Sequence, residues 1–177
     1  KGISFLDAQK LMRERNYFAA MMVNVGEADA LVSGHSRSYP SVVKPMLQLV
    51  DKAPGASIVA TANIMMTKRG SMFFSDTAIN INPSADELAK IALMTAKTAR
   101  MFGVEPVIAM VSYSNFGSST NPSAGKVREA VAYLHENYPD LCIDGEIQAD
   151  FALNPEMLKA KFPFSKLADK KVNTLVF

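Results

Sequence analysis

Residues 106–119 have the sequence PVIAMVSYSNFGSS, in which a continuous apolar run passes directly into small polar residues. An unbroken apolar run of this length predicts a strand that is covered on both faces. Downstream, Asn121 and Pro122 suit an N-cap and a first helical position, and Val127 and Val131 follow at helical spacing. The stretch therefore predicts a strand, a loop and a helix in succession, which is the repeating unit of an α/β fold.

The loop of this unit has the composition of an anion-binding loop. In open α/β sheets ligands bind at the carboxyl ends of strands, where backbone N–H groups at a helix start attract negative charge. Small residues also let a ligand approach the backbone closely. An ordinary solvated turn fits the same residues, and the stretch alone does not decide between the two. The candidate ligand-binding residues are Ser112, Ser114, Asn115, Gly117, Ser118 and Ser119.

A second loop of this kind lies nearer the N-terminus. It follows a short, mostly apolar run at 28–32 and precedes Pro40, which can open a helix that reaches Val50. The guanidinium, hydroxyl and backbone donors of this loop suit a phosphate or a carboxylate. Two such loops in one chain favour anion binding, although a surface arginine on a loop is common. The candidates here are Ser33, Gly34, His35, Ser36 and Arg37, with His35 a base or ligand for which no partner is identifiable.

The remaining sequence alternates between helical and strand patterns. We expect helices over 4–14, 84–102 and 155–161, and strands over 17–25, 57–66, 71–79, 141–143 and 172–177. Apolar strands that alternate with helices predict an α/β protein, a three-layer α/β/α sandwich in which a hairpin through 67–70 adds an antiparallel edge. The turn at Pro54-Gly55 divides the chain into residues 1–54, a partial first α/β subdomain with the Ser-Gly loop, and residues 55–177, a second α/β subdomain.

Composition excludes several classes of protein. The chain has 177 residues, 49% hydrophobic and 20% charged, which is ordinary for a globular domain. Nineteen basic and seventeen acidic residues give a net charge of +2, too even a balance for a nucleic-acid surface. No apolar run reaches the roughly 18 residues of a membrane span. We expect no nucleic-acid and no membrane partner, a cytoplasmic location, and a buried, inert thiol at Cys142 rather than a catalytic one.

Acidic residues at predicted strand ends leave two alternatives open. Asp76 and Asp144 suit a general base or a hydrogen-bond acceptor for a ligand, and they equally suit turn caps. Asp144, Glu146 and Asp150 form one acidic segment without a convergent ligand set, so we predict no metal site. The sequence contains neither GxGxxG nor GxxxxGK[ST], the two common nucleotide-loop motifs.

Several segments together resemble a known family, the phosphate acetyl/butyryl transferases. They occur in the family's order along nearly the whole chain: 26–34, 54–55, 76–83, 103–106, 112–119, 126–130 and 144–146. The form of the loop at 112–119, followed by Pro122-Ser123-Ala124, is most similar to the C-terminal phosphotransacetylase-like module of multidomain NADP-dependent malic enzymes.

This resemblance implies a fold related to isocitrate and isopropylmalate dehydrogenases, with a cleft between two α/β domains where coenzyme A and acetyl phosphate meet. It also implies a homo-oligomer, a dimer or higher. In active members the coenzyme A thiolate attacks acetyl phosphate, helped by an acid that acts as base and by Arg and Ser donors. By position, Ser33, Gly34 and the 112–119 loop would line the cleft, with Asp144 as a further candidate.

Two departures from the family pattern bear on activity. The family's Ser-Arg pair and catalytic acid belong to a segment beyond Phe177, so we expect no complete catalytic set here. Where active members carry Arg before Pro, this chain has Lys44-Pro45, and lysine keeps the charge but loses bidentate geometry. Arg37 is a candidate replacement. The start at Lys1 and the strand-like end at 172–177 lead us to expect a fragment of a longer polypeptide.

The favoured functional interpretation is a regulatory module of a malic enzyme that binds acetyl-CoA or acetyl phosphate and supports oligomerisation. Malate oxidation, NADP and a divalent metal would then belong to a malic-enzyme domain of the same polypeptide, and this stretch would hold no cofactor. The alternative is an active phosphate acetyltransferase. A second alternative is an assembly domain that binds no ligand.

Overall fold

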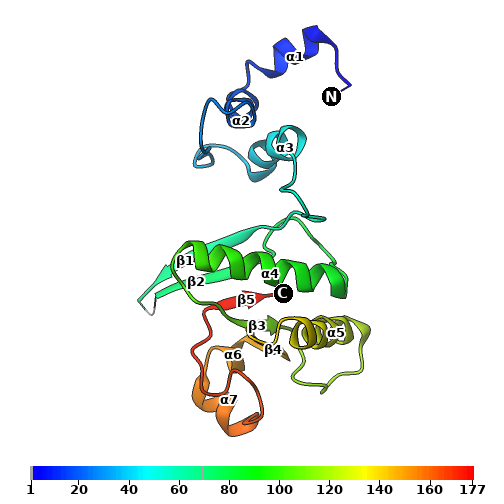
Figure 1. Cartoon of the computed structure of the whole chain (residues 1–177), viewed down its shortest axis with the longest axis vertical. Helices are drawn as coiled ribbons and strands as arrows, with labels where there is room; N and C mark the ends of the chain where they lie inside the picture. The colour runs from blue at the N-terminus through cyan, green and yellow to red at the C-terminus, as the bar shows by residue number, and fades with distance from the viewer. Residues whose placement is uncertain (1, 69) are drawn as a thin grey trace. The chain divides into compact units, whose positions relative to one another are not determined.

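A computed structural model describes residues 2–68 and 70–177, and the chain divides into two units, Lys1–Ser57 and Ile58–Phe177 (Figure 1). Unit 1 contains the helices α1 (Phe5–Leu11), α2 (Arg15–Asn24) and α3 (Tyr39–Leu49). Helices α2 and α3 pack together, and the Tyr17 hydroxyl on α2 donates a hydrogen bond to Gln48 Oε1 on α3.

The strand predicted over 17–25 is wrong, and so is the expectation that the apolar run at 28–32 precedes its loop as a strand does. Residues 17–25 lie almost entirely in α2, and residues 28–32 have no regular structure. An apolar run without strict alternation fits a helix as well as a buried strand, so periodicity did not decide it. The helix is set by its start, where the Glu14 carboxylate accepts hydrogen bonds from the backbone N–H groups of Asn16 and Tyr17 at 2.9 and 3.2 Å.

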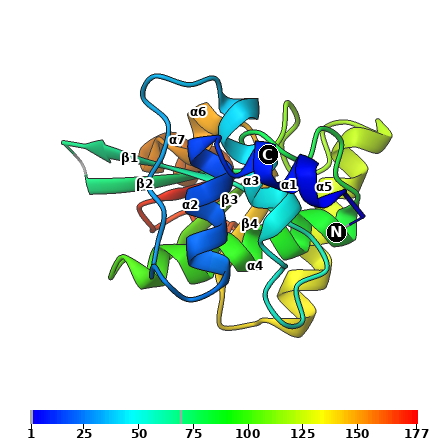
Figure 2. The same ribbon diagram turned by 90° about the horizontal axis from the view of Figure 1, so that it is seen from above.

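Unit 2 is built on a single mixed sheet with the strand order β1-β2-β5-β3-β4. Its strands are β1 (Ala62–Thr67), β2 (Gly70–Ser75), β3 (Val107–Val111), β4 (Cys142–Ile147) and β5 (Thr174–Val176). Strand β1 pairs antiparallel with β2, and the other neighbours are parallel. The predicted hairpin and its antiparallel edge are therefore confirmed. Figure 2 shows β1 and β2 side by side at this edge of the sheet. Arg69, in the predicted connection between them, lies outside the described residues.

Helices cover both faces of this sheet. Helices α4 (Ala85–Met101) and α5 (Pro122–Asn137) form one layer, and α6 (Ala149–Ala152) and α7 (Pro155–Lys161) lie on the opposite face (Figure 1). The first face buries Ile91, Ile108 and Leu134 in one core cluster, and the second buries Ile147 and Leu158 in another. This arrangement confirms the three-layer α/β/α sandwich.

Two helix starts position the segments that surround the candidate loop. Ser84 and Glu87 form a reciprocal capping box at the start of α4, and the Asn121 side chain accepts a hydrogen bond from the Ser123 N–H at the start of α5. Both starts were predicted. By contrast, β4 continues through Ile147 where the sequence predicted an end at Ile143, and this extension carries Glu146 into the sheet.

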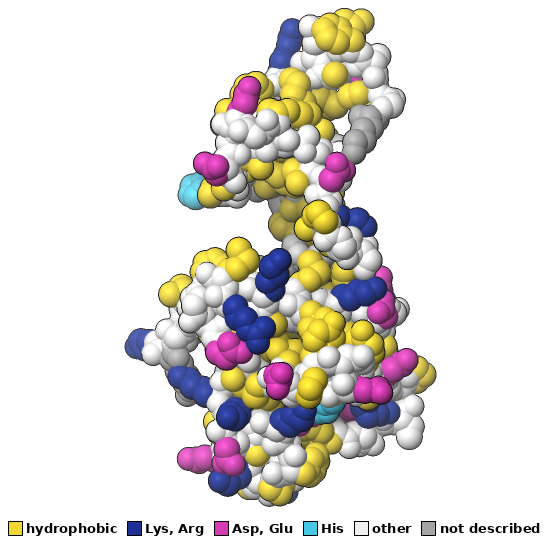
Figure 3. Space-filling view, viewed as in Figure 1, with side chains coloured by type: hydrophobic (Ala, Val, Ile, Leu, Met, Phe, Trp, Pro, Cys, Tyr) yellow, Lys and Arg dark blue, Asp and Glu magenta, His cyan; other side chains and the backbone are white. Residues whose placement is uncertain are grey.

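The distribution of charge on the surface agrees with the nearly equal numbers of basic and acidic residues. On the face drawn in Figure 3, basic and acidic side chains of unit 2 are interspersed without an extended area of one sign. None of the helices in the described ranges combines the length and the apolar character needed to cross a bilayer.

Candidate functional site

The loop between β3 and α5 folds back onto the end of β4. The Ser112 N–H donates to the Ile147 carbonyl at 3.0 Å, and the Phe116 N–H donates to the Glu146 carbonyl at 2.8 Å. Phe116 and Gly117 both have positive φ, 42° and 90°, which turns the backbone sharply between them and the helix. The loop is therefore anchored at the carboxyl end of the strands, where the sequence predicted a ligand.

The inner side of the loop surrounds a carboxyl group of the protein itself, the side chain of Glu146. Glu146 Oε1 accepts hydrogen bonds from Ser114 Oγ at 2.8 Å, from the Gly117 N–H at 2.9 Å and from Arg128 Nη1 at 2.8 Å. Glu146 is completely buried, whereas the Arg128 side chain remains 36% exposed. Hydrogen bonds to an ionised group are among the strongest in proteins, so this carboxylate is a principal anchor of the loop.

The six loop candidates fall into two groups in the structure. Ser114, Asn115 and the Gly117 N–H are engaged in bonds toward β4 and the residues after it. Ser118 Oγ lies 3.0 Å from Ser114 Oγ and accepts a hydrogen bond from the Asn115 N–H, while Ser119 Oγ lies 3.0 Å from the Tyr113 hydroxyl. Of the six, only Ser114 is buried; Asn115 is half-exposed but bonded to Gln148, which leaves Ser112, Gly117, Ser118 and Ser119 as the members through which a ligand would meet the loop.

Asp144 belongs to a separate hydrogen-bond network. Its Oδ2 accepts hydrogen bonds from Ser165 Oγ and from the Lys166 N–H, both at 2.8 Å, and His135 Nε2 lies 3.8 Å from its Oδ1. These contacts fix the segment that leads to β5. The structure therefore does not bring Asp144 into the network that holds the 112–119 loop.

Asp76 caps the turn that follows β2. Its carboxylate accepts hydrogen bonds from the Thr61 side chain and from the backbone N–H groups of Thr61, Ala78 and Asn80. Burial acts to raise the pKa of Asp76, but these hydrogen bonds lower it from 3.8 to about 2. A carboxylate with so low a pKa is a weak base, so of the two alternatives the geometry supports the turn cap.

The single cysteine has the environment expected of an inert thiol. Burial raises the pKa of Cys142 above its ordinary value of 9.0. The thiolate, which is the reactive form, is therefore scarce at neutral pH. In the described residues no group of three or more His, Cys, Asp or Glu side chains is arranged to hold a metal ion.

The N-terminal loop candidates are mostly at the surface of unit 1. Ser33 Oγ donates to Asn16 Oδ1 at 2.7 Å, and Asn16 Nδ2 in turn donates to the Ser41 carbonyl at 3.3 Å, so Ser33 helps to tie the loop to α2 and α3. Gly34 and His35 have positive φ, 138° and 39°, which turns the chain toward α3. His35, Ser36 and Arg37 are exposed, as is Lys44, which precedes the buried Pro45 within α3.

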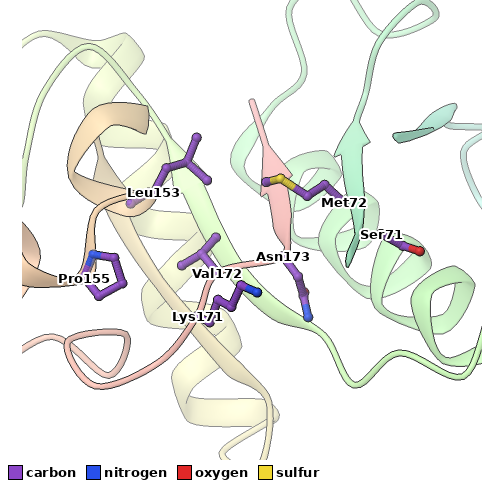
Figure 4. Close-up of a pocket in the computed structure, with 8 residues that line it drawn as sticks. Ser71, Met72, Leu153, Pro155, Lys171, Val172 and Asn173 are labelled. Carbon is purple, nitrogen blue, oxygen red and sulfur yellow. The ribbon is translucent and has the colours of Figure 1, made fainter. Parts of the chain in front are cut away.

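A cavity elsewhere in unit 2 does not coincide with either loop. Its volume is about 360 Å³, and it is lined by Ser71, Met72, Leu153, Pro155, Lys171, Val172 and Asn173, among others (Figure 4). It lies beside the first residues of β2 and the segment that leads into β5, at the amino ends of these parallel strands. Ligands of α/β sheets bind at the opposite ends, so the cavity is not the candidate site.

Comparison with known proteins identifies the family to which the chain belongs. The family model "Phosphate acetyl/butaryl transferase" matches residues 1–177. The chain belongs to this family. It is 43% identical to a phosphotransacetylase from Streptococcus pyogenes, with a TM-score of 0.86 over 98% of this chain and 53% of that one. The EutD phosphotransacetylase from Staphylococcus aureus is 37% identical, with a TM-score of 0.82 over 99% of this chain and 54% of that one.

Curated relatives within the family include two kinds of enzyme. The chain is 40% identical over 184 residues to the phosphate acetyltransferase of Thermoanaerobacterium thermosaccharolyticum, of which it covers 56%. It is 38% identical over 178 residues to the NADP-dependent malic enzyme of Haemophilus influenzae, of which it covers 23%. The chain thus spans about half the length of the shorter family members. Because most of these relatives are named phosphate acetyltransferases, they support the alternative interpretation better than the favoured malic-enzyme module.

Sequence reasoning missed the residues that hold the family's loop in this chain. Glu146 and Arg128 appeared only within an acidic segment and family-like segments, without a role of their own, and Gln148 was not singled out. One signal was present, because Glu146 lies between Gly145 and Ile147 at the end of a buried strand pattern. A charged residue that continues a buried strand needs a partner, and a search for its counter-charge would have suggested an arginine.

Proposed function

We propose that the full-length protein is a phosphate acetyltransferase, which interconverts acetyl-CoA and phosphate with acetyl phosphate and coenzyme A. The observation that carries this proposal is the whole-chain similarity to phosphotransacetylases, with TM-scores of 0.86 and 0.82 for two of them. The position of the 112–119 loop at the carboxyl end of β3 supports it, because this is where α/β sheets bind phosphate-bearing ligands.

In this reaction the thiolate of coenzyme A attacks the acetyl carbon of acetyl phosphate. A sulfur–carbon bond forms, the carbon–oxygen bond to the phosphoryl group breaks, and inorganic phosphate leaves. Donors that are fixed before the reaction stabilise the charge that develops on the phosphoryl and carbonyl oxygens. We assign this binding role to the exposed side of the 112–119 loop, from Ser112 to Ser119.

The loop has no role as a general base in this proposal. Glu146 is the carboxylate that it contacts in the described structure, and Glu146 Oε1 already accepts hydrogen bonds from Ser114, Gly117 and Arg128. A carboxylate that is buried behind the loop is in no position to take the proton of the thiol. We therefore place the base outside this loop.

Unit 1 by itself offers further candidate groups for binding phosphate. Arg37 and Lys44 are exposed cations, and Ser36, the residue before Arg37, offers an exposed hydroxyl. Cations of this kind suit the phosphates of coenzyme A as well as acetyl phosphate.

A second candidate function is the regulatory module of a malic enzyme, which binds acetyl-CoA without turning it over. Two observations favour it: the 38% identity to the Haemophilus influenzae malic enzyme, and Lys44 at a position where the resemblance implies arginine in active transferases. Under this alternative the loop still binds an acyl-CoA or acyl phosphate, but the whole protein oxidises malate.

Two assays on the purified full-length protein separate these functions. Acetyl-CoA formation from acetyl phosphate and coenzyme A is measured first, and NADP reduction with malate and a divalent cation second. We expect robust acetyl transfer and no malate oxidation. Malate oxidation together with absent acetyl transfer would overturn the proposal in favour of the regulatory module.

A further inference from the structure

The carboxylate of Glu146 is unusually deep for a charged group. Its exposed fraction is 0%, while Asp76 and Asp144 each keep 7%. Its Oε1 accepts all three of the hydrogen bonds described above, whereas its Oε2 is buried without a partner. No other buried side-chain nitrogen or oxygen in the ranges 2–68 and 70–177 lacks a hydrogen bond in this way.

A buried carboxylate in which only one oxygen accepts hydrogen bonds contributes little to the stability of a fold. Apolar residues of similar volume often stabilise a protein as well as a buried ion pair does, because the desolvation of the charges offsets their attraction. An orphaned buried oxygen adds to this cost. A purely structural position at the end of β4 would therefore favour an apolar side chain, and the presence of a charge indicates a different role.

The donors to Glu146 all control the shape of the 112–119 loop. Ser114 and Gly117 belong to the loop itself, and Arg128 lies in α5 just beyond it. Arg128 Nη1 also donates to the Ser119 carbonyl at 3.0 Å, so one guanidinium joins Glu146 to the far end of the loop. The positive φ of Gly117 belongs to the turn in which its N–H meets the carboxylate.

We propose that Glu146 is a positioning residue: its buried carboxylate holds the 112–119 loop, through Ser114, Gly117 and Arg128, in the shape that binds the phosphoryl group of acetyl phosphate. This inference rests on the proposed function. Glu146 remains behind the loop and touches no ligand. Since it occupies the Gly117 N–H and Ser114 Oγ, the ligand is left to groups on the exposed side, from Ser112, Ser118 and Ser119.

The test is the Glu146→Gln variant of the full-length protein, because glutamine keeps the size and one acceptor oxygen but removes the charge. We expect amide hydrogen exchange at Phe116 and Gly117 to accelerate by about tenfold or more. We also expect KM for acetyl phosphate to rise by about tenfold while KM for coenzyme A stays within about twofold. A merely structural role would not separate the two KM values.

Glu105→Gln is the matched control. It removes a glutamate that pairs with Arg100 at 2.8 Å, but on an exposed surface away from the loop. We expect this control to leave loop exchange and both KM values unchanged.

Three outcomes decide the inference. Unchanged exchange at Phe116 and Gly117 together with an unchanged KM for acetyl phosphate in folded Glu146→Gln would overturn it. Should that variant fail to fold, Ser114→Ala removes one of the three donors, and an unchanged KM for acetyl phosphate there overturns the inference equally. If the wild-type protein makes no acetyl-CoA, the proposed function fails, and exchange at Gly117 then decides whether Glu146 positions the loop.

Discussion

Asn115 and Gln148 hold each other through two reciprocal hydrogen bonds. Asn115 Nδ2 donates to Gln148 Oε1 at 2.5 Å, and the Gln148 N–H donates to Asn115 Oδ1 at 2.8 Å. Both residues are half-buried, and they join the 112–119 loop to the segment directly after β4. Together with the contacts to Glu146, this pair attaches the loop to the end of β4 and to the residue that follows it.

The Asn115→Ala variant tests this second attachment. It removes both hydrogen bonds and leaves the Gln148 N–H without its acceptor, so we expect the free energy of unfolding to fall by about 1–3 kcal/mol. Urea denaturation measures the change. Asn137→Ala is the control, because Asn137 donates only an exposed hydrogen bond to the Tyr133 carbonyl, and there we expect a change within about 0.5 kcal/mol. Equal effects of the two variants would contradict the attachment.

The carboxylate of Asp76 makes stability depend on pH. Its folded pKa is about 2, below the ordinary value of 3.8, so its contribution is complete above about 3.8 and is lost as the pH falls through about 2. We expect Asp76→Asn to lower the free energy of unfolding at neutral pH by about 1–2 kcal/mol, and to have a smaller effect near pH 2. Denaturation curves of both proteins across this range provide the test. A difference that does not depend on pH would refute the assignment.

Gly145 on β4 lies opposite Met110 on β3. A Cβ at this position would meet the Met110 carbonyl oxygen at 2.5 Å, and the φ of +150° is one that side-chain-bearing residues rarely adopt. We expect Gly145→Ala to destabilise the protein by about 3 kcal/mol or more, because the Met110 carbonyl oxygen belongs to the backbone of β3 and cannot move away without disturbing the sheet. Gly125→Ala, on a helix with only the Arg128 guanidinium 3.9 Å away, should instead stabilise by about 0.5–1 kcal/mol. Thermal denaturation of both variants checks the opposite signs.

Lys44 offers a test of the proposed acetyl transfer from unit 1. If its ammonium contacts a phosphate, Lys44→Ala should raise KM for acetyl phosphate or coenzyme A by about tenfold, and Lys44→Arg should restore or improve it through bidentate geometry. Steady-state kinetics of the full-length protein gives both values. Lys10→Ala, an exposed cation on α1, is the control and should have no effect. Wild-type kinetics in Lys44→Ala would remove Lys44 from the site.

Local signals made part of the fold predictable. The β3 strand, the loop after it and the start of α5 depend on neighbouring residues: an apolar run, small polar residues, and Asn121 before Pro122. The start of α4 was predictable in the same way, because Ser84 and Glu87 have the sequence spacing of a capping box. Helix α2 was not predictable in this way, because its apolar run fits two structures and the deciding contact is a cap from Glu14.

The contacts between residues of the candidate site were harder to predict from the sequence. Ser114 and Glu146 are separated by 32 positions, and their contact depends on β3 and β4 lying side by side. The strand pattern around Glu146 indicates that its carboxylate needs a partner, but it does not show that this partner is the loop, which Asp144 does not contact. The sequence located the loop, and the sheet register selects its counter-charge.

The central position of β5 has a consequence for folding. Thr174–Val176 lies between β2 and β3, so the hairpin on one side and the β3–β4 pair on the other are joined through these three residues. The pairing of Phe73 with Thr174 links positions about a hundred residues apart, and such distant contacts form slowly. We therefore expect the hairpin and the β3–β4 pair to remain separate during synthesis, each with an uncovered strand edge, until β5 has left the ribosome and can pair with both.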